Sequence, residues 1–328
     1  MKLGINGFGR IGRLVFKAAL QNNMQVVGIN DITNSKTLAH LLKYDSIHGR
    51  FDGDISSDDK NIIVNGNKIP VSAELDPTKL GWGKLGADIV LECTGKFSTK
   101  DDAIKHIQAG AKKVLISAPA KGHDGTFIPG INCSKYDKSK HDVISIGSCT
   151  TNCLAPLVKV LLENFGIVRG YMTTIHAYTA DQKIQDAPHK DLRRARAAAA
   201  SMVPTSTGAA KAISEIFPEV KGKLDGTAVR VPTICGSLID FSVIVEKETT
   251  AADVNSAFKK AADGSLKDAL EYCEDPIVSV DVIGNRHGSI LDSQMTWAQG
   301  NLVKVFSWYD NEWGFSNRMI DMLKVMSK

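Results

Sequence analysis

The segment that most constrains the fold is Gly7-Phe8-Gly9-Arg10-Ile11-Gly12, which has the pattern G-x-G-x-x-G. It follows a short apolar run at residues 3–5 and opens a stretch with apolar residues at helical spacing. In this setting the first glycine permits a tight turn, the second lets backbone approach a pyrophosphate, and the third lets the helix pack on a sheet. A glycine cluster can also mark an ordinary turn, but this context favours a phosphate site at the helix N-terminus.

The first half of the chain alternates strands and helices. Apolar runs at residues 26–29, 89–91, 114–116 and 143–146 are typical of buried strands, and amphipathic stretches at residues 38–42 and 103–107 lie between them. Residues 62–64 and 68–69 flank Asn65-Gly66-Asn67 and predict a hairpin. The alternation predicts a doubly wound parallel sheet covered on both faces, ending near Gly147.

Asp31 follows the second predicted strand, nineteen positions after Gly12 (31 − 12). A carboxylate at this place accepts hydrogen bonds from the adenosine ribose hydroxyls and repels a 2′-phosphate, which favours NAD over NADP. An ordinary loop aspartate is the alternative interpretation. Its register with the glycines favours the cofactor role.

The second half has longer strand patterns and fewer helices. Strands are expected at residues 168–175, 229–231, 238–245, 277–283 and 302–308, and the third of these alternates apolar and polar residues. Such alternation is typical of a mostly antiparallel sheet with one buried face. Thr250 is predicted to cap a helix that ends near Lys260, and residues 312–326 are predicted to form a closing helix. The half is therefore expected to be an α+β domain.

Composition narrows the function classes. The 328 residues are 43% hydrophobic and 23% charged, with a net charge of +4, and no block of like charge suggests a nucleic-acid arm. No apolar run has the length of a membrane span, and the N-terminus lacks the apolar core of a signal peptide. The six cysteines are scattered, without the spacing of a disulfide framework or a metal site. We therefore expect a cytoplasmic protein without a bound metal.

Cys149 follows a predicted strand and precedes a helical stripe that begins at Leu154. A cysteine at a helix N-terminus experiences a partial positive charge, which favours the nucleophilic thiolate. A small buried residue is the other common fate of a free cysteine, and the spacing alone leaves both open. Cys153, one turn later, is expected to be buried structure.

Other residues have the chemistry to assist such a cysteine. His176 ends the predicted strand 172–175 and would act as its base if the two meet in space, although a lone histidine is often only a hydrogen-bonding residue. Thr207 and Gly208 precede a helix, where hydroxyl and free N–H groups bind phosphate. Arg230 alternates with two valines, and its guanidinium suits a bidentate phosphate. Arginines 193, 194 and 196 form a basic cluster that also fits a solvated face or a subunit contact.

Together these motifs resemble the phosphorylating glyceraldehyde-3-phosphate dehydrogenase family over the whole length of the chain. The residues that carry the resemblance occur in the family's order: Asn6-Gly7-Phe8-Gly9-Arg10-Ile11-Gly12-Arg13, Ser148-Cys149-Thr150-Thr151-Asn152-Cys153, His176-Ala177-Tyr178-Thr179, Arg193-Arg194-Ala195-Arg196, Thr207-Gly208-Ala209-Ala210-Lys211 and Trp308-Tyr309-Asp310-Asn311-Glu312-Trp313-Gly314. The resemblance implies a Rossmann NAD-binding domain at residues 1–147, with the helix 312–328 packed back on it, and a catalytic domain at residues 148–311. It also implies a homotetramer, with an arginine-containing loop near residues 177–202 reaching a neighbouring cofactor.

The resemblance assigns roles residue by residue. Cys149 matches the nucleophile that forms a thioester, and His176 matches its base. The positions that match contacts with substrate phosphate or inorganic phosphate are Ser148, Thr150, Thr179, Arg194, Thr207, Gly208 and Arg230. The positions that match the cofactor site are Asn6, Gly7, Gly9, Arg10, Ile11, Asp31, Thr94, Gly95, Ser117 and Asn311, the last on the nicotinamide amide. The implied reaction oxidises D-glyceraldehyde 3-phosphate to 1,3-bisphosphoglycerate with NAD and inorganic phosphate.

Some positions depart from the family pattern. Leu75 stands where many relatives have an arginine near the adenine, and Ala187 replaces a common leucine, as in relatives that use NADP. Phe315 replaces a tyrosine, Ile146-Gly147 replaces Asn-Ala, and Thr233-Ile234-Cys235-Gly236-Ser237 differs from the commoner sequence after the arginine. Two alternative functions stay open. One is an erythrose-4-phosphate dehydrogenase, and the other is a non-catalytic NAD-binding or adhesion module.

Overall fold

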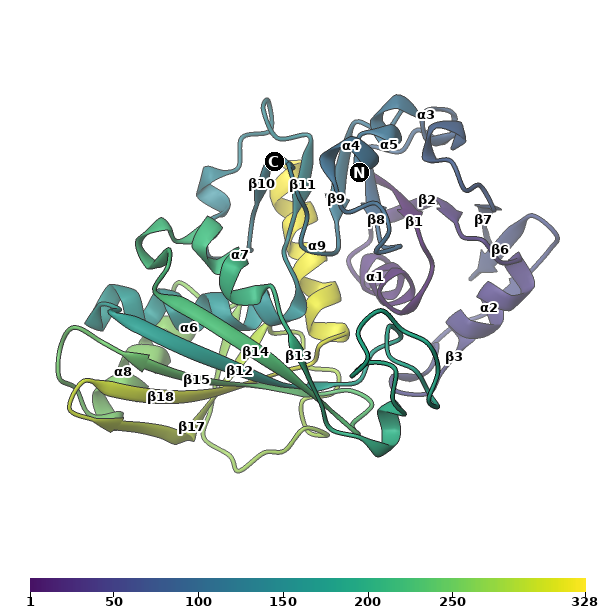
Figure 1. Ribbon diagram of the computed structural model, residues 1–328. Helices are drawn as coiled ribbons and strands as arrows, with labels where there is room; N and C mark the ends of the chain where they lie inside the picture. The colour runs from purple at the N-terminus through teal and green to yellow at the C-terminus, as the bar shows by residue number, and fades with distance from the viewer. The chain divides into compact units, whose positions relative to one another are not determined.

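The computed structural model describes all 328 residues, which form two compact units. The first unit comprises residues 1–127, 134–147 and 319–328, and the second comprises residues 128–133 and 148–318. Figure 1 shows the path of the chain through them. No helix is both long enough and apolar enough to cross a membrane.

The sheet of the first unit has nine strands in the order β10-β11-β9-β8-β1-β2-β7-β6-β5. Neighbouring strands from β10 to β7 run parallel, and β7, β6 and β5 are antiparallel. The strand bounds are Lys2–Asn6 (β1), Gln25–Asn30 (β2), Ile55–Ser57 (β5), Asn61–Val64 (β6), Asn67–Ser72 (β7), Ile89–Glu92 (β8), Lys113–Ile116 (β9), Gly125–Thr126 (β10) and Val143–Ser145 (β11). A small separate sheet pairs β3 (Tyr44–Asp45) with β4 (Gly49–Arg50).

Helices cover both faces of this sheet, as predicted. The helices are Arg10–Gln21 (α1), Ser35–Lys43 (α2), Trp82–Leu85 (α3), Lys100–Ala103 (α4) and Lys105–Gln108 (α5). Val90 packs with Trp82 of α3, and its register neighbour Val114 packs with Ala103 of α4, so these helices share one face. Ile5 is the register neighbour of Leu91, and both side chains point to the other face of the sheet. On that face Ile5 approaches Gly12 of α1, so α1 covers it.

Two local predictions in this unit have clear outcomes. The hairpin is confirmed, because β6 and β7 are antiparallel and its turn residues Asn65 and Gly66 have φ of 49° and 80°. Two left-handed residues in a two-residue turn match the twist of the strands they join. The helical stretch expected at residues 103–107 is confirmed, and the chain there forms two four-residue helices that meet at Ile104.

The second unit has a seven-stranded sheet in the order β13-β14-β12-β15-β18-β17-β16. The strands are Arg169–Ala177 (β12), Val203–Ser206 (β13), Leu224–Val231 (β14), Ser237–Ile244 (β15), Leu270–Cys273 (β16), Ser289–Gln299 (β17) and Leu302–Tyr309 (β18). Only the β12–β14 and β16–β17 pairs are parallel. The expected fold class is therefore confirmed, a parallel-rich Rossmann-type sheet followed by a mostly antiparallel one.

One face of this second sheet carries the core of the unit. The helices Cys149–Phe165 (α6), Ala209–Ile216 (α7) and Ala251–Asp263 (α8) contribute to that core, and Thr250 caps α8 as predicted. Ile239, Phe241 and Val243 point inward from β15, whereas Asp240 and Ser242 are partly exposed. The last helix, Trp313–Ser327 (α9), begins in the second unit and ends in the first.

One predicted strand in the second unit is wrong. Residues 277–278 are irregular and residues 279–283 form turns, and the side chains of Val278 and Val280 are 56% and 65% exposed. Their apolar alternation resembles that of a half-buried strand, but no partner strand hydrogen-bonds to them. The structure instead contains β13, β16 and β17, which sequence periodicity did not identify.

Candidate active site

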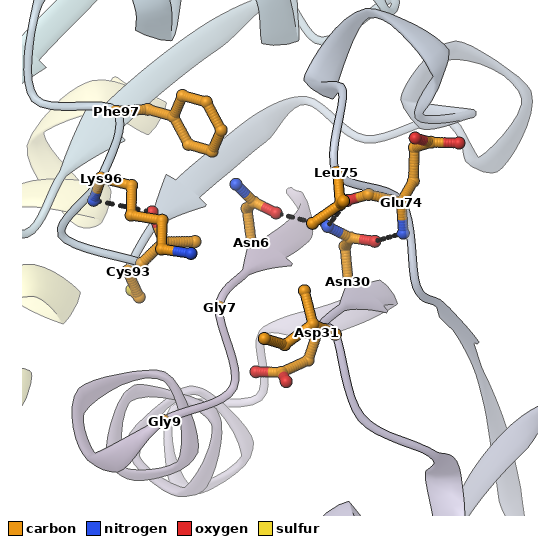
Figure 2. A pocket seen from close by; sticks show the side chains of 12 residues that line it. Asn6, Gly7, Gly9, Asn30, Asp31, Glu74, Leu75, Cys93, Lys96 and Phe97 are labelled. Atoms are coloured by element: carbon orange, nitrogen blue, oxygen red, sulfur yellow. Dashed lines mark hydrogen bonds between the residues drawn. The ribbon is translucent and has the colours of Figure 1, made fainter.

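A cavity of about 320 Å³ lies in the first unit, where the loops after β1, β2, β7 and β8 meet (Figure 2). The C-terminal edge of a parallel sheet is the usual place for a bound ligand in this fold class. The lining residues are Asn6, Gly7, Gly9, Asn30, Asp31, Ile32, Glu74, Leu75, Cys93, Thr94, Lys96 and Phe97. Five of the predicted cofactor residues are therefore brought together here, namely Asn6, Gly7, Gly9, Asp31 and Thr94.

The glycine-rich turn shapes one wall of this cavity. Gly7 has φ of +88°, and a Cβ there would lie 2.7 Å from the backbone nitrogen of Thr94, so only glycine fits. A Cβ on Gly9 would meet no atom within 4 Å, which leaves the backbone open to a ligand. Gly9 is also the N-cap of α1 and provides no side-chain cap. The free N–H groups at the start of α1 therefore fit the pyrophosphate of a dinucleotide.

Asp31 anchors the same turn. Its Oδ2 atom accepts a 2.7 Å hydrogen bond from the backbone N–H of Phe8. The contact fixes the carboxylate at the edge of the cavity, where a ribose hydroxyl could share it.

Four other predicted cofactor residues do not line the cavity: Arg10, Ile11, Gly95 and Ser117. Arg10 instead forms a 2.8 Å ion pair with Asp45. Ser117 donates to the carbonyl oxygen of Glu92.

The nucleophile candidate lies in the second unit, at the start of a helix as predicted. Cys149 is the first residue of α6, and Ser148 is its N-cap. Ser148 and Thr151 form a reciprocal capping box, in which the Ser148 hydroxyl accepts from Thr151 N–H and the Thr151 hydroxyl accepts from Ser148 N–H. The box fixes the first turn of the helix and with it the position of the cysteine.

His176 meets Cys149 in space, which the sequence alone could not establish. It lies near the end of β12, is buried, and places Nε2 3.4 Å from Cys149 Sγ. Its other ring nitrogen, Nδ1, lies 2.6 Å from the carbonyl oxygen of Ala177. A proton on Nδ1 would bond this oxygen and leave Nε2 free to accept a proton from the thiol.

The pKa values of this pair follow mainly from burial. Burial, together with the Arg230 charge, lowers the pKa of His176 to about 3, so the imidazole is neutral at physiological pH. Burial raises the pKa of the Cys149 thiol, and the Arg230 charge opposes that rise. The backbone N–H groups of Thr150 and Cys149 at the helix start lower the pKa of this thiol, in the direction expected of a helix N-terminus, but burial of the sulfur is the largest effect.

Arg230 connects the reactive pair to a polar cluster. Its Nη1 atom lies 2.8 Å from His176 Nδ1, 3.2 Å from the Ala177 carbonyl oxygen and 3.3 Å from the Thr179 hydroxyl. The Thr179 hydroxyl in turn donates to Asp181. The Nε atom of Arg230 is buried without a hydrogen-bond partner. An unused guanidinium donor beside a cysteine–histidine pair fits an anionic group on the substrate.

Asp181 also contacts the second predicted phosphate residue. It lies 2.5 Å from Arg194, which makes further hydrogen bonds of 2.9 and 3.0 Å to the Thr205 hydroxyl. A second carboxylate, Asp191, is 3.4 Å from Arg194. Arg194 is thus held by protein carboxylates, an arrangement that the sequence analysis did not anticipate.

The remaining predicted phosphate residues lie at helix starts. Gly208 is the N-cap of α7 without a side-chain cap, and the Thr207 hydroxyl accepts from the backbone N–H of Ala209. Thr150, in the first turn of α6, bonds the hydroxyl of Tyr309 at 3.0 Å.

Asn311 has a defined amide orientation. Its Oδ1 atom accepts from the Gly236 N–H at 3.1 Å and from the Ser237 hydroxyl at 2.9 Å. The amide NH₂ is therefore directed away from these donors and can serve as a donor itself. Gly236 and Ser237 belong to the 233–237 stretch for which the sequence offered no functional account.

Sequence reasoning gave no role to Tyr309. Its hydroxyl bonds both Thr150 and Thr174, and its ring stacks edge-on against His176 at 5.9 Å between centroids. Burial raises the pKa of Tyr309 well above its ordinary value. The only available signal was its place in the motif 308–314, because its neighbours are distant in sequence.

Comparisons with known proteins agree with this geometry. Residues 1–100 match the family described as glyceraldehyde 3-phosphate dehydrogenase, NAD binding domain, and residues 148–311 match its C-terminal domain. Glyceraldehyde-3-phosphate dehydrogenase of Geobacillus stearothermophilus is 58% identical, over 98% of this chain and 97% of that protein. Glyceraldehyde-3-phosphate dehydrogenase 1 of Bacillus subtilis is 57% identical over 100% and 98%, and the enzyme of Mycobacterium avium is 53% identical over 100% and 99%.

Proposed function

The chain belongs to the glyceraldehyde-3-phosphate dehydrogenase family, and from this premise we propose that it converts D-glyceraldehyde 3-phosphate to 1,3-bisphosphoglycerate with NAD and inorganic phosphate. The observation that carries the proposal is the 3.4 Å approach of Cys149 Sγ to His176 Nε2, with Arg230 beside both. A nucleophile, a base and a cation for an anionic substrate are thus within one site.

The first half-reaction oxidises the aldehyde at the cysteine. Cys149 sulfur attacks the carbonyl carbon as its proton passes to His176 Nε2, and His176 returns this proton to the former carbonyl oxygen, so that a hemithioacetal forms and the base is free again. NAD, when bound, accepts the hydride that leaves this carbon. His176 takes the proton of the hemithioacetal hydroxyl as the thioester forms. The backbone N–H of Cys149 at the start of α6 and the His176 side chain are the donors for the developing oxyanion.

The second half-reaction releases the product. Inorganic phosphate attacks the thioester carbon, the bond to Cys149 sulfur breaks, and an acyl phosphate leaves. We assign the phosphate of the substrate to Arg230 and Thr179, since the two side chains contact each other beside His176. We assign the binding of inorganic phosphate, and further contacts with the substrate, to polar and cationic residues around α6 and α7. These residues are Ser148, Thr150, Arg194, Thr207 and Gly208.

NAD is the cofactor, and we assign its site to the cavity of the first unit. The uncapped start of α1 would hold the pyrophosphate and Asp31 the adenosine ribose. The full proposed set keeps Asn6, Gly7, Gly9, Arg10, Ile11, Asp31, Thr94, Gly95, Ser117 and Asn311. Asn311 would donate its amide NH₂ to the carboxamide oxygen of the nicotinamide.

The proposed assembly is a homotetramer. Residues 178–202 contain three large apolar side chains that are mostly exposed, Ile184, Leu192 and Met202, at 87%, 80% and 74%. Exposed apolar side chains of this size on one irregular segment are typical of a protein interface. Mass measurement by light scattering on the purified protein tests the proposal, and a monomer would overturn it.

The proposed location is the cytoplasm. None of the six cysteines forms a disulfide bond, and Cys149 must stay reduced to act as a nucleophile. Fractionation of cells with an antibody to the chain tests this location.

The reaction itself is tested by phosphate-dependent NADH formation. Wild type should form NADH from glyceraldehyde 3-phosphate, whereas Cys149→Ser should form no covalent acyl-enzyme by mass spectrometry and almost no NADH. Cys273→Ser is the matched control, since Cys273 is distant in sequence from Cys149 and its thiol donates to the carbonyl oxygen of nearby Asp275. Appreciable turnover by Cys149→Ser would overturn the thioester route. A higher kcat/KM on erythrose 4-phosphate would indicate the related dehydrogenase, and no NADH with either aldehyde would favour a binding module.

A further inference from the structure

A network of hydrogen-bonded polar side chains, buried except for Ser72, crosses the C-terminal ends of four adjacent strands beneath the cavity of the first unit. Asn6 ends β1, Asn30 ends β2, Ser72 ends β7 and Glu92 ends β8, in the spatial order β8-β1-β2-β7. Asn6 donates to Glu92 at 2.6 Å, Asn30 donates to Asn6 at 2.7 Å, and Ser72 donates to Asn30 at 2.9 Å. Asn6 and Asn30 also line the cavity, so this network of side chains forms part of the cavity floor (Figure 2).

Glu92 is the single carboxylate in this network of Asn6, Asn30, Ser72 and Glu92, and it is 1% exposed. Its Oε2 atom accepts from Asn6 Nδ2 and from His106 Nε2, the latter at 3.0 Å. Its Oε1 atom accepts from the backbone N–H of Thr94 at 2.8 Å and from the Thr94 hydroxyl. Four donors thus surround one buried carboxylate, which is the arrangement that makes burial of a charge tolerable.

Trp82 determines which nitrogen of His106 carries the proton. The indole N–H of Trp82 donates to His106 Nδ1 at 3.1 Å. An indole can only donate, so Nδ1 must be the acceptor and Nε2 must hold the hydrogen that faces Glu92. Trp82 and His106 are both buried, and the tautomer is fixed by packing of α3 and α5.

The two oxygens of Glu92 act on two adjoining parts of the cavity lining, the loop after β8 and the end of β1. Through Oε1 the carboxylate fixes Thr94, whose hydroxyl oxygen accepts from Lys96 N–H at 3.0 Å. Cys93, Thr94, Lys96 and Phe97 form the wall after β8. Through Oε2 the carboxylate fixes Asn6, at the entrance of the glycine-rich turn.

We infer that Glu92, oriented by the Trp82–His106 pair, is a positioning residue for NAD, because it holds both Asn6 and Thr94, which line the cavity, without lining the cavity itself. The inference rests on the proposed function in so far as this cavity holds the cofactor. The carboxylate belongs to the first unit, whereas the cysteine–histidine pair belongs to the second. It should therefore govern cofactor affinity and leave the chemistry at Cys149 unchanged.

The variant Glu92→Gln tests this inference. Glutamine keeps the shape, but its NH₂ must face either the Thr94 donors or the Asn6 and His106 donors. The dissociation constant of NAD, measured by calorimetry, should rise about tenfold. The value of kcat at saturating NAD and the rate of Cys149 alkylation by iodoacetamide should match wild type. Glu271→Gln is the matched control, since Glu271 accepts from Asn285 and His287 in the second unit.

A double variant makes the test specific. Trp82→Phe removes the indole donor, so that His106 can carry its proton on Nδ1 and accept at Nε2 from the side-chain amide that Glu92→Gln introduces. Glu92→Gln with Trp82→Phe should therefore bind NAD more tightly than Glu92→Gln alone, although both single variants lower the melting temperature. A purely structural role would give additive losses of stability without this recovery of affinity.

Two outcomes would overturn the inference. One is NAD affinity of Glu92→Gln equal to wild type, and the other is a parallel loss of kcat and of affinity. If Glu92→Gln does not fold, Thr94→Val deletes a single donor, and an unchanged dissociation constant there would have the same meaning. Failure of wild type itself to bind NAD would instead overturn the proposed function, so the two failures are distinguishable.

Discussion

Arg230 Nη1 lies 2.8 Å from His176 Nδ1, the same nitrogen that lies 2.6 Å from the carbonyl oxygen of Ala177. The two neighbours demand opposite tautomers of the imidazole. Donation by Arg230 needs a lone pair on Nδ1 and places the ring proton on Nε2, facing Cys149. Donation to Ala177 places the proton on Nδ1 and leaves Nε2 free to act as a base. A substrate phosphate that takes up the Arg230 donors would thus favour the basic form of His176.

The first prediction concerns the charge of Arg230. Because this charge lowers the pKa of both the Cys149 thiol and His176, Arg230→Gln should raise both values. The pH midpoint for alkylation of Cys149 by iodoacetamide should move upward by roughly one unit. Arg196→Gln, in an exposed pair with Asp186, should leave the midpoint in place. A midpoint that stays put or falls in Arg230→Gln would contradict this electrostatic assignment.

The second prediction concerns Ser237, which joins two parts of the site. Its hydroxyl oxygen accepts from the Ala177 N–H at 3.1 Å, and its O–H donates to Asn311 Oδ1. Ser237→Ala should free the Asn311 amide to rotate, so KM for NAD should rise about fivefold, while KM for phosphate stays constant.

The free energy of unfolding should fall by about 2 kcal/mol in Ser237→Ala, because two buried hydrogen bonds, one from the Ala177 N–H and one to Asn311, are lost. Ser242→Ala, on the partly exposed face of the same strand, is the control for strand stability. If KM for NAD is unchanged while stability falls as expected, Ser237 has a structural role alone.

The third prediction follows from the Asp45 carboxylate. Burial would raise its pKa, but the backbone N–H groups of His48 and Ile47 and the Arg10 guanidinium outweigh burial and lower the pKa to about 2. A depressed pKa contributes stability that is present above the unfolded-state value, 3.8, and is lost as pH falls toward 2.

Asp45→Asn should therefore lower the free energy of unfolding by about 2 kcal/mol at neutral pH and by progressively less below about pH 4. Urea unfolding at several pH values measures the difference. Asp52→Asn, at an exposed position nearby in the chain, should have little effect at any pH. A loss of stability that is equal at neutral and acidic pH would show that Asp45 acts through packing and not through its charge.

Sequence patterns predicted the fold where burial and periodicity coincide. Seven of the nine strands of the first sheet, the hairpin at Asn65 and the cap at Thr250 involve neighbours in sequence or one repeating face, so local signals identified them, whereas the short strands β5 and β10 were missed. The strand prediction for residues 277–283 was wrong because the alternation of Val278 and Val280 looks the same whether a partner strand is present or not. β17 was missed because only its first four residues are buried and the rest mix polar and apolar side chains.

The candidate site shows the same division. The positions of Gly7 and Cys149 followed from their places at strand–helix junctions. The hydrogen bonds from Trp82 to His106 and from His106 to Glu92 could not be predicted, because these residues come from two helices and a strand and meet only in the folded unit. A histidine on the apolar face of a predicted helix was the one available signal of such a network.

The last prediction concerns cofactor choice, for which the sequence contains opposing features. Asp31 lies at the cavity and should repel a 2′-phosphate, whereas the family resemblance implies that Ala187 replaces a bulkier leucine and so opposes the phosphate less. Close like charges cost several kcal/mol, against about one for a missing methylene group or two, so the charge should dominate. Wild type should therefore have a much higher kcat/KM with NAD than with NADP.

Two variants at position 31 separate charge from anchoring. Asp31 accepts from Phe8 N–H at 2.7 Å, and asparagine can keep that bond through its amide oxygen while removing the charge. Asp31→Asn should therefore gain NADP activity with little loss of thermal stability. Asp31→Ala should gain it too, because the freed Phe8 N–H can donate to a 2′-phosphate, but it should melt at a lower temperature, since the glycine-rich turn loses its anchor. Equal wild-type kcat/KM for the two cofactors would show that the Asp31 carboxylate does not face the ribose.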